Sequence, residues 1–131
     1  DLPGCAALLL RAMEEAPAGL VTVSTDSNGS LPRWNEKKEL VGIEAASIQT
    51  LHETVKTMVQ VLGCPLERAI APATEHVARA LNLYPAKGCL AAGSDGDILL
   101  LDEALNIRTV YAMGRCMLRD GVLLAPAPFE N

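Results

Sequence analysis

The stretch Leu20-Val21-Thr22-Val23-Ser24-Thr25-Asp26 is a short β-branched run, which is the composition of a buried strand. The run ends at a carboxylate and continues as Ser27-Asn28-Gly29-Ser30-Leu31-Pro32, whose residues favour a turn. A charged side chain at the carboxyl end of an apolar strand is unfavourable unless something pairs with it. In a barrel of parallel strands, that end is also where catalytic groups lie. Asp26 is therefore the first candidate for a functional residue.

Two interpretations of Asp26 follow from its position. Its carboxylate can cap the following turn by accepting hydrogen bonds from the amides of Asn28 or Gly29, as aspartate often does. Alternatively, Asp26 can be a metal ligand or a general base at the mouth of a barrel. The position alone does not choose between these interpretations.

The composition limits the kinds of partner. The chain has 131 residues, of which half are hydrophobic, but it has only one Trp, two Tyr and one Phe, so one modest core must be built from aliphatic side chains. The formal charge is -5 and the 11 basic residues are scattered, which argues against nucleic acid and anionic membranes as partners. No apolar run approaches the length of a membrane span.

The four cysteines lie at positions 5, 64, 89 and 116, with no C-x-x-C pair. This spacing argues against a cysteine metal site and predicts an intracellular, reduced setting, hence a cytoplasmic protein. The sequence opens at Asp1 and leads directly into a helical pattern, so we expect it to be a segment of a longer protein.

The first half of the chain alternates helix and strand. Apolar residues at helical spacing predict a helix over residues 3–16, which Pro17 and Gly19 end. A helix followed by a strand at 20–25 is typical of α/β proteins.

Residues 27–46 form a long polar connection of the kind that is often functional or folds into a local hairpin. Within it, residues 39–43 could form a small strand. We expect Trp34 to pin this connection to the body of the protein rather than to stack on a ligand.

The strongest helical pattern covers residues 47–62, with Ser47 as the N-cap and Gly63 as the left-handed residue after its end. Pro65 begins a short helix over 65–71, and Thr74 begins another. His52 and His76 lie alone at helical positions without a histidine at the spacing of a zinc site, so we interpret both as structural.

From residue 83 the pattern changes to short strands. They are predicted at 97–102, 107–113, 115–119 and 122–124, with Asp120-Gly121 as a strong hairpin turn. Three or four short strands cannot bury both faces of a sheet, so we expect their partners to lie elsewhere.

The segment Lys87-Gly88-Cys89-Leu90-Ala91-Ala92-Gly93-Ser94-Asp95-Gly96-Asp97-Ile98 resembles the pattern KG-x-(I/L)-x-x-G-x-D-A-D-(I/L) near the carboxyl end of amidohydrolase-superfamily enzymes. Gly96 stands where that pattern has alanine, which is a mild departure at a turn. Residues 21–32 resemble the more specific segment SSDGNGS-x-P of isoaspartyl dipeptidases, also called β-aspartyl peptidases. Thr25 and Ser27 depart from it, standing for serine and glycine.

Two further stretches resemble isoaspartyl dipeptidases. Thr50-Leu51-His52-Glu53-Thr54-Val55 is similar to their TLLETV, and Phe129-Glu130 is similar to their carboxy-terminal FE. The similarity runs nearly end to end. It covers what would be the last third of such an enzyme.

The resemblance implies an α/β fold, with residues 1–83 as the carboxy-terminal part of a (β/α)8 barrel and residues 84–131 as strands of a small β-sandwich domain. It implies a zinc-dependent hydrolase that cleaves β-aspartyl dipeptides by attack of a metal-bound hydroxide, with a binuclear centre whose other ligands lie outside this segment. Asp26 would end the eighth barrel strand, bind one zinc and take the proton. Ser30 would hydrogen-bond the substrate, and the whole enzyme would be a homo-oligomer.

Two other functions remain open. The tail pattern also fits other amidohydrolases of the dihydroorotase, hydantoinase or deacetylase type, although the Asn28-Gly29-Ser30 loop favours the isoaspartyl dipeptidases. The chain could also belong to a non-catalytic scaffold that kept the fold and lost the metals. An intact H-x-H pair and two later histidines upstream would exclude the scaffold.

Overall fold

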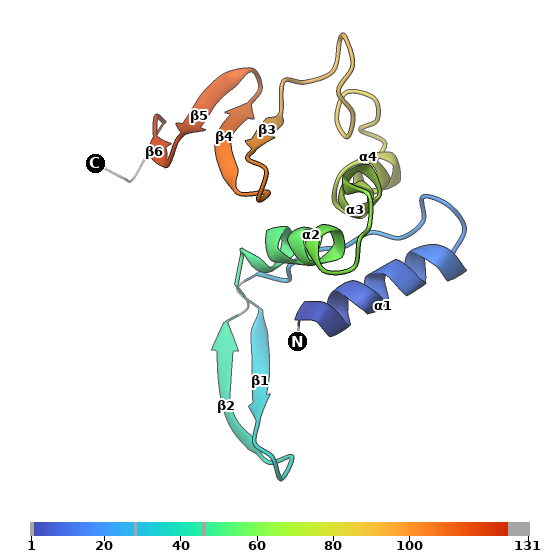
Figure 1. Cartoon of the computed structure of the whole chain (residues 1–131), viewed down its shortest axis with the longest axis vertical. Helices are drawn as coiled ribbons and strands as arrows, with labels where there is room; N and C mark the ends of the chain where they lie inside the picture. The colour runs from blue at the N-terminus through green and yellow to red at the C-terminus, as the bar shows by residue number, and fades with distance from the viewer. Residues whose placement is uncertain (1, 28, 46, 126–131) are drawn as a thin grey trace.

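The computed structural model describes residues 2–27, 29–45 and 47–125. The helices are α1 (Leu2–Glu15), α2 (Thr50–Gln60), α3 (Leu66–Ile70), the 3-10 turn η1 (Ala71–Ala73) and α4 (Glu75–Ala80). The strands are β1 (Ser30–Trp34), β2 (Leu40–Ala45), β3 (Ile98–Leu101), β4 (Ile107–Ala112), β5 (Arg115–Arg119) and β6 (Val122–Leu123). Figure 1 shows a helical body between a projecting β1–β2 hairpin and the β3–β6 sheet. The predicted mixed α/β class is confirmed, whereas the barrel and the sandwich stay predictions.

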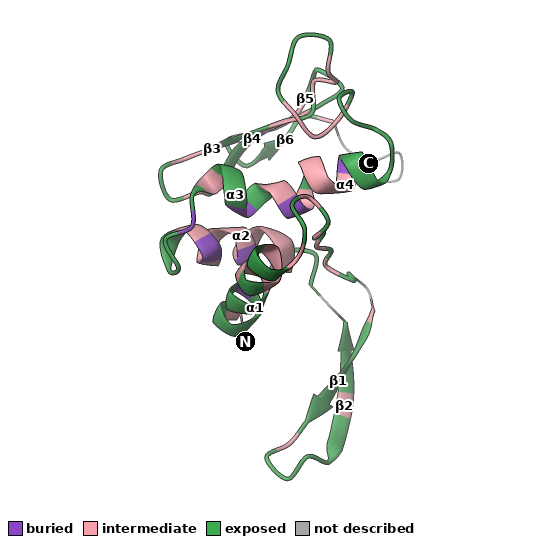
Figure 2. Cartoon of the chain, turned by 90° about the vertical axis from the view of Figure 1, so that its right-hand side faces the viewer, coloured by how far each residue is buried: buried purple, intermediate pink, exposed green. Residues whose placement is uncertain are grey.

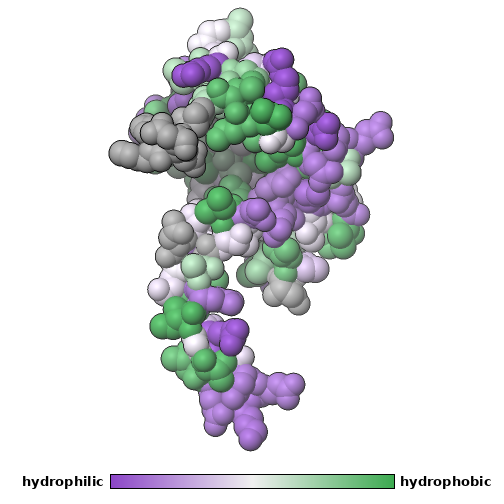
Figure 3. Space-filling view, turned by 90° about the vertical axis from the view of Figure 1, so that its left-hand side faces the viewer, coloured by the Kyte–Doolittle hydropathy of each residue, from purple (hydrophilic) through white to green (hydrophobic). Residues whose placement is uncertain are grey.

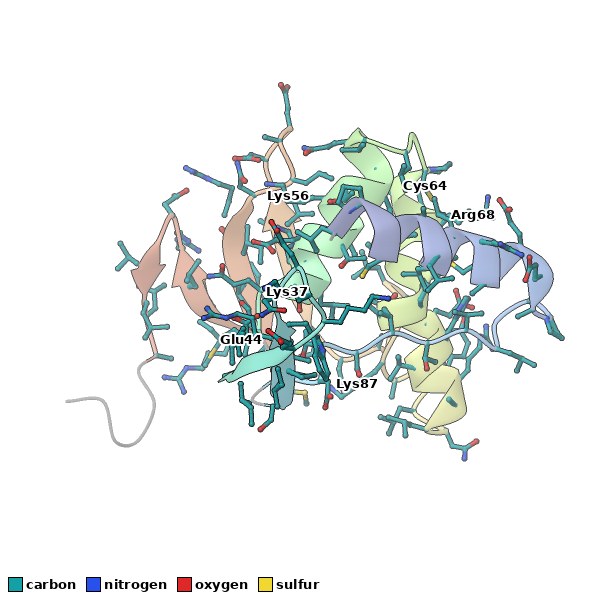
Figure 4. The ribbon with its side chains drawn as sticks, turned by 90° about the horizontal axis from the view of Figure 1, so that it is seen from below. Lys37, Glu44, Lys56, Cys64, Arg68 and Lys87 are labelled. Carbon is teal, nitrogen blue, oxygen red and sulfur yellow. The ribbon has the colours of Figure 1, made fainter. Side chains whose placement is uncertain are left out.

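The helices pack around a small core. Ala6 of α1 and Met58 of α2 are fully buried, and Cys64 and Ala69 complete the cluster. Alanine at two of these positions lets the helix backbones approach closely, so the apolar faces of α1, α2 and α3 share one core. At the core's edge, Arg68 of α3 pairs with Glu14 of α1 (Nη2–Oε1 3.4 Å). Cys64 and Arg68 are labelled in Figure 4.

The predicted start of α2 was wrong by one turn. The helix begins at Thr50, and Ser47 lies in a preceding turn where its Oγ accepts the Gln49 N–H at 3.1 Å. Serine forms such local bonds two residues ahead easily, and here this bond competes with the cap of the helix. The helix also ends two residues earlier than predicted, at Gln60. The predicted left-handed Gly63 is confirmed by its φ of +67, and the N–H of Cys64 returns to the Met58 carbonyl at 2.9 Å.

The polar connection folds into the β1–β2 hairpin, which confirms a strand near 39–43. The antiparallel register runs from Ser30 opposite Ala45 to Trp34 opposite Leu40. At the tip, Asn35 Oδ1 accepts the N–H groups of Lys37 and Glu39, each at 2.9 Å. This side-chain bonding fixes the turn locally, without help from the body.

The expectation that Trp34 pins this segment to the body was wrong. Trp34 is 57% exposed, and the hairpin that carries it projects into solvent (Figure 2). Because β1 pairs with β2 alone within the described ranges, Trp34 is carried outward with its strand. Figure 3 shows the hairpin with a hydrophilic tip and hydrophobic side chains nearer the body. Its exposed apolar residues are Leu31, Trp34, Leu40, Val41 and Ile43.

The last strands form one antiparallel sheet in the order β3-β4-β5-β6. Asp120 and Gly121 have φ +48 and +80, which confirms the predicted tight turn between β5 and β6. The sheet is joined to α2 by Lys56, whose Nζ donates to Asn106 Oδ1 at 2.7 Å (Figure 4). Gln60 adds a bond to the Ala104 carbonyl at 2.9 Å.

A charged cluster fastens the segment before β3 to the turn after β4. Lys87 pairs with Asp95 at 3.0 Å and with Asp97, and Asp97 Oδ1 also accepts the Met113 N–H at 2.7 Å. The Lys87 ammonium, followed by the Met113 amide, lowers the pKa of Asp97 from its ordinary value. Hydrogen bonds to Asp97 and Asp95 raise the pKa of Lys87.

Gly96 packs its backbone against the turn after β4. A Cβ atom at position 96 would lie 2.8 Å from the backbone nitrogen of Gly114. The Gly114 N–H also donates to the Gly96 carbonyl at 2.9 Å. The departure from alanine at this position therefore has a steric reason: the two backbones touch.

None of the helices in the described ranges is long and apolar enough to cross a membrane.

Candidate functional site

Residues 20–26 run beside the helices without joining a strand ladder within the described ranges. The strand predicted at 20–25 is therefore not formed here, because its described neighbours are helices rather than strands. Two long-range bonds hold the segment: the Val23 N–H donates to the Pro72 carbonyl at 3.2 Å, and His76 Nδ1 lies 2.7 Å from the Val21 carbonyl. His76 thus has a structural role, as predicted.

Asp26 ends this segment at a turn. It is exposed and has φ +48, a left-handed conformation that aspartate tolerates better than most residues. The Gly29 N–H donates to the Asp26 backbone carbonyl at 2.9 Å, and the Ser27 N–H donates to Thr25 Oγ1 at 3.1 Å. Both bonds fix the backbone on either side of the carboxylate.

The capping interpretation of Asp26 is wrong for Gly29, which binds the backbone carbonyl rather than the carboxylate. Asn28 lies outside the described residues, as does the Phe129-Glu130 pair. Within the described part of the chain, no residue hydrogen-bonds to the Asp26 carboxylate. Ser27 does not have a positive φ, so serine fits where the related segment has glycine.

Ser30 is the first residue of β1 and lies opposite Ala45 in the hairpin. Its side chain is exposed, and its hydroxyl has no hydrogen-bond partner among the residues that the structure describes. Asp26 and Ser30 therefore flank one short turn, each with an uncommitted polar group. The turn brings together the two residues that the sequence singled out.

The side chains near this turn can be compared with the ligands that a metal ion requires. Among the described positions, no three His, Cys, Asp or Glu side chains come together at a spacing that could hold a metal ion. A catalytic zinc takes about three protein ligands. The Asp26 carboxylate is exposed and uncommitted, so it fits as one oxygen ligand. His76 belongs to no such group of three among the described residues, and its Nδ1 lies 2.7 Å from the Val21 carbonyl.

Two surface cavities lie near this region, and neither is lined by Asp26 or Ser30. One, of about 390 Å³, is lined by Val23 and Ser24 together with residues of α1 and α2. The other, of about 420 Å³, is lined by His52, Glu53 and Lys56. The carboxylate of Asp26 is thus presented on an open turn rather than inside either cavity.

Sequence reasoning missed two contacts that shape this turn. His76 reaches Val21 across 55 residues, and no local pattern predicts such a bond. The tight approach of Gly29 to Asp26 was also missed, although a glycine three residues after a candidate ligand is a usable signal.

The chain is similar to known hydrolases over most of its length. A family model described as Amidohydrolase family matches residues 5–122. N-acetylglucosamine-6-phosphate deacetylase of Bos taurus is 32% identical over 114 aligned residues, covering 75% of this chain and 28% of the relative.

Two solved structures also match. The beta-aspartyl dipeptidase of Fervidobacterium islandicum AW-1 in complex with beta-Asp-Leu dipeptide superposes with a TM-score of 0.81 at 30% identity, covering 96% of this chain and 33% of that one. A second structure of the dipeptidase from this organism gives 0.73 at 26% identity, covering 95% and 30%. The chain thus spans about a third of the length of the relatives it matches.

Proposed function

This chain belongs to the amidohydrolase family of hydrolases, and from that premise we propose that it is the carboxy-terminal part of a zinc-dependent enzyme that hydrolyses β-aspartyl dipeptides. In this proposal, Asp26 binds zinc and carries the proton, and Ser30 binds the substrate. The remaining ligands come from outside these residues.

The observation that carries the proposal is the likeness to the beta-aspartyl dipeptidase, which covers 96% of this chain at a TM-score of 0.81 and 30% identity. The loop from Asp26 to Ser30 supports it, since this loop also carries the specific sequence resemblance. Residues 20–26 join no strand ladder within the described ranges, which is compatible with a barrel strand whose neighbouring strands lie outside these residues.

Hydrolysis of an amide needs a group that accepts a proton and a group that orients the substrate, and Asp26 and Ser30 can supply them. Bound zinc would lower the pKa of a water molecule to near 7, so that the water can attack an amide at neutral pH. The Asp26 carboxylate accepts the proton released in this attack and delivers it to the departing amine. The free hydroxyl of Ser30 donates a hydrogen bond that orients the dipeptide. No described side chain competes for either group.

A second function has a specific observation in its favour. The sequence match to N-acetylglucosamine-6-phosphate deacetylase, at 32% identity over 114 aligned residues, names a different amide substrate. Both reactions hydrolyse an amide and can use the same carboxylate for proton transfer. We rank the deacetylase second because that match covers 75% of this chain, against 96% for the dipeptidase structure.

The test is a direct comparison of substrates with the purified full-length protein. We expect release of leucine from β-Asp-Leu with a kcat/KM at least about 100-fold above that for N-acetylglucosamine 6-phosphate. The zinc content of the same preparation is measured alongside. Preferred release of acetate would establish the deacetylase instead, and a zinc-free protein inactive on both substrates would support the scaffold.

A further inference from the structure

Gly29 lies close to Asp26, on the side where a side chain at position 29 would project. A Cβ atom at position 29 would lie 2.7 Å from the Asp26 carbonyl oxygen, 3.0 Å from Oδ2 and 3.1 Å from Cγ. Carbon atoms of real side chains essentially never approach another heavy atom below 3.0 Å. A side chain at position 29 therefore clashes first with the Asp26 carbonyl oxygen, and it also requires the carboxylate to shift by a few tenths of an ångström.

The need for glycine here is one of space rather than of backbone conformation. Gly29 does not have a positive φ, so an L-residue could adopt its backbone angles. Gly63 is the opposite case: its φ is +67, and a Cβ there would meet nothing within 4 Å. Gly29 is thus required by what lies against it, which is the Asp26 carbonyl and, a few tenths of an ångström farther away, the Asp26 carboxylate.

The contact between Gly29 and Asp26 also accounts for how the Asp26 side chain is oriented. Hydrogen bonds from Gly29 and Ser27 fix the backbone around Asp26, but no described residue bonds to its carboxylate. The direction of the side chain is therefore set by packing. Oδ2 and Cγ of Asp26 lie next to Gly29, on the side where a Cβ atom would project.

We propose that Gly29 is a positioning residue, whose missing side chain lets the Asp26 carboxylate lie back over the turn and sets the direction in which it meets zinc and the transferred proton. The inference rests on the proposed function, in which Asp26 is a ligand. It assigns no chemistry to Gly29 itself. A methyl group at position 29 displaces the carboxylate, and it also strains the bond from the Gly29 N–H to the Asp26 carbonyl.

The experiment compares the full-length protein with its Gly29→Ala variant. Loss of a group that orients a ligand costs about 10–100-fold in metal affinity, so we expect zinc to dissociate at least about tenfold more readily, as measured by competition with a chromogenic chelator. We expect kcat on β-Asp-Leu to fall by about tenfold, less than the roughly 100-fold cost of a full ångström of misplacement, while KM changes by less than about threefold. The control is Gly42→Ala, since a Cβ at position 42 meets nothing within 4 Å and its φ is not positive.

A second variant pair separates positioning from a general structural role. In an Asp26→Ala background the carboxylate is gone, so adding Gly29→Ala should leave zinc affinity unchanged within about twofold, as expected when one residue acts only through another. Equal further weakening in that background would overturn the inference. So would a Gly29→Ala protein that fails to fold, or one with the zinc affinity and kcat of the wild type.

These outcomes are distinct from failure of the proposed function. A wild-type protein inactive on both substrates and unable to bind zinc refutes that function, and the inference with it. An active, zinc-loaded wild type whose Gly29→Ala variant behaves identically refutes the inference alone.

Discussion

Asp26 is the side chain on which the proposed chemistry depends most. In the proposed function, replacing it by Asn or Ala removes the proton acceptor and a carboxylate contact to the metal, while its exposed position means that the fold loses little packing. We expect kcat/KM on a β-aspartyl dipeptide to fall by about 10²–10⁴-fold, the usual contribution of general acid–base catalysis. A loss smaller than about tenfold in steady-state assays, with the melting temperature unchanged, would reject the assignment.

In the proposed function, Ser30 has a lesser role at the same turn. Its hydroxyl is free of described partners, so Ser30→Ala should remove one hydrogen bond to the substrate, worth about 0.5–1.5 kcal/mol. We expect this to appear mainly as a higher KM, with zinc content unchanged. Complete inactivation of a folded, zinc-loaded variant would show that Ser30 takes part in the chemistry.

At the level of elements, the Lys87 cluster connects the segment before β3 to the turn after β4. The bond from Lys87, and then that from Met113, keeps the pKa of Asp97 below its ordinary value. A carboxylate with a depressed pKa stabilises the fold above its unfolded pKa of about 4, and this contribution is lost as the pH falls through the folded value. Because the pKa of Lys87 is raised in the fold, its contribution to stability is lost only in strongly alkaline solution, above its unfolded pKa of about 10.4.

We therefore expect Lys87→Met to flatten the acid limb of the stability profile. The melting temperature of the wild type should fall more steeply than that of the variant as the pH drops below about 4, where the carboxylate becomes protonated. Lys37→Met is the matched control, because Lys37 forms no ion pair with a described residue. Parallel melting curves for wild type and Lys87→Met across the acid range would contradict this account.

At the level of the molecule, residues 1–131 hold one candidate zinc ligand, and their described part contains no group of three. Large apolar side chains are also exposed, including Leu20 at 72% and Leu90 at 80%. Expressed alone, this segment should bind no zinc tightly, hydrolyse no β-aspartyl dipeptide and tend to aggregate through uncovered apolar surface and strand edges. Zinc analysis, activity assays and melting curves check this, and a monomeric, cooperatively melting, active preparation would overturn it.

The sequence predicted what local chemistry controls. Gly63 ends α2 and Asp120-Gly121 turns β5 into β6, because left-handed backbone angles favour those residues wherever the chain goes. Trp34 and Ser47 were mispredicted because their places depend on competition: strand pairing carries Trp34 outward, and a local turn takes the Ser47 hydroxyl.

In the candidate site, too, local features could be predicted from the sequence and contacts between distant segments could not. The turn after Asp26 could be predicted from its Ser, Asn and Gly residues. The bond between His76 and Val21 could not be, because it joins segments 55 residues apart. The packing of Gly29 against the carboxylate also needed coordinates, since a composition favouring turns does not say which atoms touch.

The β1–β2 hairpin has a mechanical consequence. Its first residue, Ser30, directly follows Gly29, so a long two-stranded arm is attached at the loop that carries Asp26 (Figure 1). A bulky label on Lys37 would therefore move with an arm whose first strand begins one residue after Gly29. The hairpin tip is therefore accessible to labelling, but a label there is attached close to the candidate site. A probe intended to leave catalysis undisturbed belongs at the β5–β6 turn instead.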